Sequence, residues 1–68
     1  MNIIGKITNN NGTFDICTVY YLGEVWIATY DPIEDEVDYL TIVGDNDDII
    51  EFANKLFRGQ PSYEVFNS

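Results

Sequence analysis

The chain has 68 residues and a formal charge of -9, from twelve Asp or Glu side chains against three Lys or Arg side chains. This length predicts one domain, and a hydrophobic content of 46% is too high for a disordered chain. Phosphate contacts need basic side chains, so the charge argues against direct binding of nucleic acid or of an anionic membrane. We expect a partner with a basic protein surface.

Four β-strands are expected before residue 44. Their predicted ranges are Asn2–Thr8, Thr13–Leu22, Glu24–Tyr30 and Val37–Val43. The stretch Asn9–Gly12 and the residue Gly23 predict tight turns, because Asn and Gly tolerate positive φ. Pro32 ends the third strand because proline lacks the N–H that a β-ladder requires.

A helix is predicted after the fourth strand, with Asp45 or Asn46 as its N-cap. The apolar side chains recur at the helical period, at Ile49, Ile50, Phe52, Ala53, Leu56 and Phe57. Glu51 and Lys55 have the favourable i,i+4 spacing, and Gly59 suits a left-handed helix end.

The predicted fold is α+β, an antiparallel four-stranded meander with one helix packed on one face. The tail Ser62–Phe66 alternates apolar and polar residues, and it adds a short edge strand or docks on the sheet. Alternation places an aliphatic set on one face, which suits the helix, and an aromatic set on the other. The aromatic set is Val19, Tyr21, Trp26 and Tyr30. Three covers are open for it: Tyr63 and Phe66 of the tail, a second copy of the chain, or a partner.

Catalysis has little support in the sequence, and we expect neither an enzyme nor a cofactor. Histidine is absent, and Cys17 lies in mid-strand with no base to activate it, so it is expected to be a small core residue. The segment Asp45–Asp48 hints at a calcium loop, but Ile50 and Leu56 stand where that loop needs Gly and Glu, so no metal site is expected. The first residues are too polar for a signal peptide, which predicts a cytoplasmic protein, in the host cytoplasm if a phage encodes it.

The segment Asp31–Glu51 holds nine carboxylates and no Lys or Arg. They are Asp31, Glu34, Asp35, Glu36, Asp38, Asp45, Asp47, Asp48 and Glu51. One interpretation is that they keep the protein soluble and protect an edge strand. The other is mimicry of a polyanion, with Glu34, Glu36 and Asp38 as a row about 6.6–6.8 Å apart on one strand, comparable with phosphates. In that hypothesis Tyr21, Trp26 and Tyr30 supply anchoring contacts.

The run YLTIVGDNDDIIEFANKLFRG (Tyr39–Gly59) resembles the strand, acidic turn and helix of small acidic phage inhibitors. The groups concerned are phage inhibitors of uracil-DNA glycosylase and anti-CRISPR proteins. The resemblance implies an acidic surface that occupies the nucleic-acid channel of a partner, and hence an anti-defence or host-takeover inhibitor. The alternative is an accessory domain that self-associates through the aromatic face and is acidic only for solubility.

Overall fold

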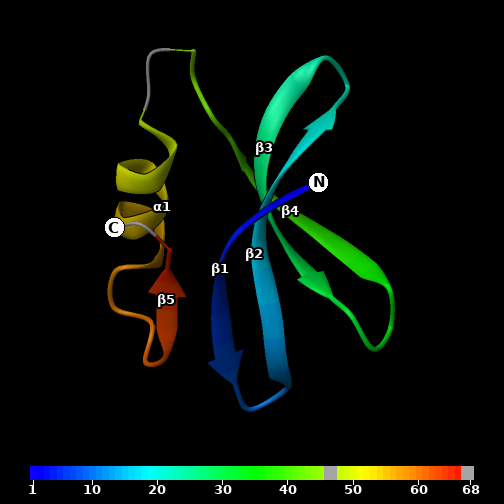
Figure 1. The fold of residues 1–68 in the computed structure, drawn as a ribbon, viewed down its shortest axis with the longest axis vertical. Coiled ribbons are helices and arrows are strands. Elements are labelled where there is room, and N and C mark those ends of the chain that lie inside the picture. The colour runs from blue at the N-terminus through cyan, green and yellow to red at the C-terminus, as the bar shows by residue number, and fades with distance from the viewer. Residues whose placement is uncertain (46–47, 67–68) are drawn as a thin grey trace.

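The computed structural model describes residues 1–45 and 48–66. Five strands form one antiparallel sheet in the order β4-β3-β2-β1-β5 (Figure 1). The elements are β1 (Asn2–Asn9), β2 (Gly12–Tyr21), β3 (Glu24–Asp31), β4 (Glu36–Ile42), α1 (Ile49–Phe57) and β5 (Tyr63–Val65). This confirms the predicted order of four strands, one short helix and a fifth strand from the tail.

Tight turns join the first three strands, as predicted. In the β1–β2 turn, Gly12 has a φ of 127°, and the Asn9 side chain accepts a hydrogen bond from the Asn11 N–H at 2.8 Å. The β2–β3 turn has positive φ at both central residues, 53° at Leu22 and 78° at Gly23. Two such residues match the twist of a hairpin, but leucine is an unusual residue there because its Cβ disfavours positive φ.

One buried cluster joins the strands and the helix. Its members are Ile4, Ile7, Ile16, Ile27, Val43, Ala53, Phe57 and Val65. Ile16 of β2, Ile27 of β3 and Ala53 of α1 are fully buried. Cys17 and Ala28 are also fully buried, but they lie outside this cluster and pair with each other across β2 and β3. The expected burial of Cys17 is therefore confirmed.

The tail forms a short edge strand beside β1. Gly5 pairs with Val65, and the backbone N–H groups of Thr8 and Phe66 donate to the carbonyl oxygens of Ser62 and Ile4. A Cβ atom at position 5 would collide with the Glu64 carbonyl oxygen, so only glycine allows β5 to lie this close.

The N-cap of α1 is Asp48, whose side chain accepts hydrogen bonds from the N–H groups of Ile50 at 3.0 Å and Glu51 at 3.2 Å. The prediction of Asp45 as the cap is wrong, because a capping side chain must directly precede the first helical residue, which is Ile49. The alternative cap, Asn46, lies outside the described residues. The left-handed end at Gly59 is present, with a φ of 91°.

Candidate functional site: an acidic hairpin beside an aromatic sheet face

Eight of the nine predicted acids lie in the described chain, in two groups toward the two ends of β4 (Figure 1). The hairpin group lies where β3 turns into β4 and consists of Asp31, Glu34, Asp35, Glu36 and Asp38. The helix-start group consists of Asp45, Asp48 and Glu51. Asp47 lies outside the described residues. The two ends of β4 are about 20 Å apart, at roughly 3.3 Å per residue. The expected single acidic surface is thus two smaller ones.

Local hydrogen bonds determine the shape of the hairpin tip. The Asp31 carboxylate accepts from the N–H groups of Ile33 at 2.9 Å and Glu34 at 3.2 Å, which holds the chain in a turn. Asp35 has a left-handed φ of 55°, which Asp tolerates better than most residues. Four turn residues therefore separate the two strands.

The predicted row of Glu34, Glu36 and Asp38 is wrong in one member. Glu34 lies in the turn, because its N–H donates a hydrogen bond to the Asp31 side chain. It therefore lies outside β4 and does not share the alternation of Glu36 and Asp38. Glu36 and Asp38 are two residues apart on β4 and share a face, opposite Asp31 and Thr29 of β3. Both acids are exposed.

β4 is an edge strand of the described sheet. Charges on an edge strand oppose pairing with another chain. Glu36 and Asp38 therefore suit the protective interpretation as well as the binding one.

Tyr30 connects the hairpin group to the aromatic face. Its hydroxyl donates to the Asp35 carboxylate at 2.7 Å. This hydrogen bond raises the pKa of Tyr30, and partial burial and the nearby charges of Asp35, Asp15 and Asp31 act in the same direction. The phenolic proton is therefore held more tightly beside Asp35 and Asp31, neither of which has an ion pair within the described residues.

Three aromatic rings meet on the other face of the sheet from Ile16 and Ile27. The Tyr21 and Tyr39 rings are stacked with centroids 4.5 Å apart, and Trp26 meets Tyr39 edge-on at 5.7 Å. The Trp26 indole N–H donates to the Tyr21 carbonyl oxygen at 3.1 Å. Val19 pairs directly with Trp26. The predicted aromatic set is therefore brought together, with Tyr30 nearer the hairpin.

Tyr39 was missed by the sequence analysis, although it is central to this group. The signal was the alternation of Val37 and Tyr39 along β4, which places both on the aromatic face. A bulge then adds Leu40 as an extra residue, since Ala28 pairs with Tyr39 and Ile27 with Thr41. Alternation read without that bulge assigns the rest of β4 to the wrong faces.

The tail does not cover these rings. Tyr63 packs against the buried cluster, with its ring 6.1 Å from that of Phe57. β5 and β3 are separated by β1 and β2, so they lie about 14 Å apart at roughly 4.8 Å per strand. Of the three covers expected for the aromatic face, a second copy and a partner therefore remain.

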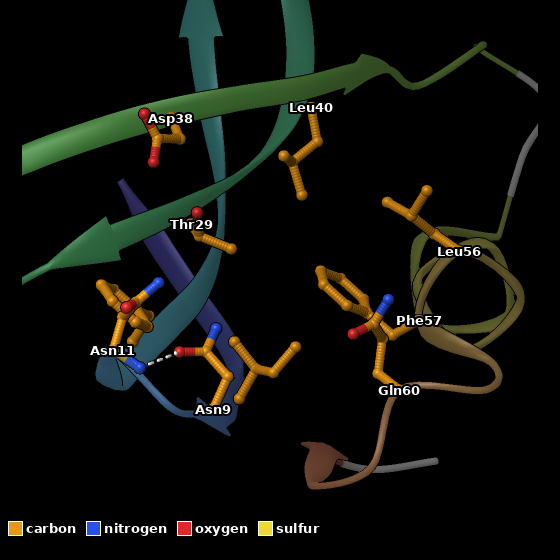
Figure 2. Close-up of a pocket in the computed structure, with 10 residues that line it drawn as sticks. Asn9, Asn11, Thr29, Asp38, Leu40, Leu56, Phe57 and Gln60 are labelled. Atoms are coloured by element: carbon orange, nitrogen blue, oxygen red, sulfur yellow. Dashed lines mark hydrogen bonds between the residues drawn. The ribbon is translucent and has the colours of Figure 1, made fainter.

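A second concave feature lies between the C-terminal part of α1 and the sheet (Figure 2). We call it the helix–sheet pocket. It has a volume of about 500 Å³ and is lined by Ile7, Asn9, Asn11, Phe14, Thr29, Asp38, Leu40, Leu56, Phe57 and Gln60. Among the described residues that line it, Asp38 alone is ionisable, so the hairpin group extends into the pocket.

Other chemistry has little support from the described residues. Burial and the charge of Asp15 raise the pKa of Cys17, which keeps its thiol protonated at neutral pH. Within residues 1–45 and 48–66, no group of three or more potential metal ligands comes together. No helix in that part of the chain is long and apolar enough to cross a membrane. No protein-family model, no curated protein and no solved structure matches this chain.

Proposed function

We propose that this protein is a small non-catalytic binding protein that occupies the basic surface of a nucleic-acid-handling partner. In this proposal it acts as an anti-defence or host-takeover inhibitor of the phage type, in the cytoplasm of the host. In this proposal α1 packs over the aliphatic face of the sheet, and the acidic hairpin and the aromatic face are the surfaces that contact the partner.

The observation that carries the proposal is the exposed, unneutralised hairpin group. Five carboxylates lie within eight consecutive residues, 31–38, and none of them has an ion pair in the described chain. Such a concentration of like charge destabilises a compact domain through self-repulsion, and a cationic partner surface relieves that repulsion. Electrostatic steering would also speed association with such a partner.

The proposal predicts that partner capture depends on salt and competes with DNA. We would tag the protein, capture partners from a bacterial lysate, and elute with salt or with duplex DNA. The complex is expected to weaken at least about tenfold between about 50 and 500 mM salt, because screening and ion release oppose it. Capture that neither salt nor DNA reduces would contradict the proposal.

A matched pair of variants locates the contact. Glu34→Ser, Glu36→Ser and Asp38→Ser together remove three charges from the hairpin group and are expected to abolish capture. Asp45→Ser, Asp48→Asn and Glu51→Gln together remove three charges from the helix-start group, with the asparagine at position 48 still able to cap α1, and are expected to leave capture largely intact. Equal losses in both variants would point to net charge rather than to the hairpin.

The second candidate function is self-association through the aromatic face. It is favoured by the exposure of the stacked rings, 43% for Tyr21 and 39% for Tyr39, and of the neighbouring Leu22 at the hairpin tip, which is 77% exposed. Leu22 holds a positive φ that costs about 1–2 kcal/mol in a non-glycine residue. An exposed leucine in a strained turn suggests retention for contact rather than for folding.

Sedimentation tests this candidate. Trp26→Ala and Leu22→Asn are both expected to convert a dimer into a monomer. Leu22→Asn is also expected to raise the free energy of unfolding by about 1 kcal/mol, because Asn-Gly suits this turn. A wild-type protein that stays monomeric at high concentration would exclude self-association.

A further inference from the structure

The helix–sheet pocket has apolar walls that come from distant parts of the chain. Figure 2 shows Leu40 of β4 and Leu56 of α1 projecting into the space between strand and helix, with Phe57 beside them. Leu40 is 44% and Leu56 38% exposed, so both present apolar surface to solvent. An apolar group inserted between them would bury that surface, and a volume of about 500 Å³ lies within the usual range for ligand sites.

The polar residues of the pocket lining determine which polar or charged groups the occupant can have beside its apolar group. Asn11 and Gln60 supply carboxamides, and Asn9 supplies its NH2 group, because its oxygen already accepts from the Asn11 N–H. Thr29 supplies a hydroxyl, and Asp38 supplies a charge. In the described part of the chain, the Asp38 carboxylate has neither a hydrogen-bond donor nor a cation as partner. An anionic occupant would be repelled here, whereas a cation beside the apolar group would pair with Asp38. Carboxamides are suited to the N–H and C=O groups of a peptide backbone.

The same side of β4 continues this arrangement beyond the pocket. Leu40 and Asp38 both line the pocket, and Glu36 follows at the next alternate position, opposite Asp31. Leu40, Asp38 and Glu36 thus form a row of one apolar and two acidic side chains. Alternate side chains on a strand lie about 6.6–6.8 Å apart, which is also the spacing in an extended peptide laid alongside it.

We infer that the helix–sheet pocket and the β4 row receive an extended segment of the partner with one large apolar residue and two Lys or Arg residues at alternate positions. The apolar side chain enters between Leu40 and Leu56, and the two cations face Asp38 and Glu36. This inference rests on the proposed function and names the partner's contact chemistry. The occupant is a basic peptide segment because every charge along this row is negative and the lining offers peptide-binding carboxamides.

Short blocked peptides test the inference on the intact protein. The probe is the peptide Gly-Leu-Gly-Arg-Gly-Arg-Gly, with matched versions in which Leu becomes Ala or both Arg become Glu. We expect millimolar binding, detected as amide chemical-shift changes at Asp38, Leu40 and Leu56. The Ala version is expected to bind about five- to tenfold more weakly because it buries less apolar surface, and the Glu version not at all.

Protein variants separate the apolar contact from the charge contact. Leu56→Ser should weaken the Leu peptide about fivefold and leave the Ala peptide unchanged, as a double-mutant cycle requires for a direct contact. Asp38→Asn should weaken both arginine peptides and flatten their salt dependence. Ile3→Ser, which alters an exposed aliphatic side chain of β1 outside the pocket, is the control and should change neither. Retained dispersion of amide signals shows that each variant is folded.

Several results would overturn the inference: no shifts with millimolar peptide, equal affinity for the Leu and Ala versions, or shifts confined to Tyr21, Trp26 and Tyr39. Different results would contradict the pocket assignment and the proposed function. If the hairpin variant loses partner capture but Leu56→Ser and Leu40→Ser do not, the proposed function stands and the pocket assignment falls. If capture ignores salt, DNA and the hairpin variant, the proposed function falls first.

Discussion

The two acidic groups at the ends of β4 have similar composition but different structural roles. In the helix-start group, Asp48 accepts two N–H groups of α1 and Glu51 pairs with Lys55 at 3.4 Å. In the hairpin group, Asp31 and Asp35 accept hydrogen bonds, but Glu34, Glu36 and Asp38 have no partner within the described residues. Carboxylates with local partners are explained by folding. Glu34, Glu36 and Asp38 have no such partner, so a role in binding explains them better than a role in folding.

The largest expected effect on stability comes from Asp48. Asp48→Ala removes the only described side-chain acceptor for the N–H groups of Ile50 and Glu51, and loss of an N-cap costs about 0.5–2 kcal/mol. Urea denaturation measures the change. Glu34→Ala, at an exposed acid with no described partner, is the control and should stay within about 0.5 kcal/mol of the wild type. If Asp48→Ala and Glu34→Ala were equally destabilising, the helix-start group and the hairpin group would not differ in their contribution to folding.

Asp31 is expected to have the next largest effect, and it tests whether charge or hydrogen bonding shapes the hairpin. Asp31→Ala removes the acceptor for Ile33 and Glu34 and should cost about 0.5–1.5 kcal/mol. Asp31→Asn keeps an acceptor oxygen and loses the charge, so its unfolding free energy should lie near that of the wild type. An Asn variant as unstable as the Ala variant would mean that the charge itself stabilises the turn.

The sequence predicts the frame well because local signals agree there. Alternating residues on β2 and β3 identify Ile16 and Ile27 as one face, and the helical period identifies Ala53 and Phe57. Gly59 and the turn glycines stand where the chain needs positive φ. These elements depend on neighbours within a few residues, so the chain order and the approximate boundaries follow from the sequence.

The candidate site is less predictable because it depends on single side chains and long-range register. The Asp31 side chain accepts a hydrogen bond from the N–H of Glu34, so Glu34 stays in the turn and β4 begins only at Glu36. The expected acidic row therefore loses Glu34. The bulge at Leu40 places Thr41 opposite Ile27 and Ile42 opposite Trp26, on the faces that plain alternation would not assign to them. The pocket itself needs the end of α1 to meet four strands, a geometry that no local pattern encodes. In the sequence, Asp38 is one of nine acids with nothing to distinguish it, whereas in the described structure it is the one ionisable residue that lines the pocket.

A smaller effect is expected from the ion pair in the helix-start group. Glu51 and Lys55 are both largely exposed, and such an i,i+4 pair stabilises a helix by only about 0.3–0.5 kcal/mol. Glu51→Gln should lower the free energy of unfolding by that amount at low salt and by less at high salt. A double-mutant cycle with Lys55→Gln checks the pairing. A coupling energy above about 1 kcal/mol would contradict the description of Glu51 and Lys55 as a weak, exposed ion pair.

The smallest effect at neutral pH concerns Tyr30, because its contribution appears only in alkaline solution. Tyrosine in an unfolded chain ionises near pH 10, whereas the hydrogen bond to Asp35 and the surrounding carboxylates raise the pKa of Tyr30 in the folded protein. The folded state therefore holds the phenolic proton more tightly than the unfolded state does. The resulting stabilisation is complete below about pH 10 and is lost as the pH rises through the folded pKa.

Asp35→Asn removes the nearest charge but keeps an acceptor oxygen, so the pKa of Tyr30 should fall toward its ordinary value. Tyrosinate absorbance measures this when each protein is compared with its own Tyr30→Phe counterpart, which removes the signal of the other tyrosines. Glu51→Gln is the matched control and should leave the titration of Tyr30 unchanged, because Asp35, Asp15 and Asp31 are the charges that act on Tyr30 and Glu51 is not among them. If both variants shifted the titration equally, the net charge of the protein would govern Tyr30, and the hairpin group would not act as a local cluster.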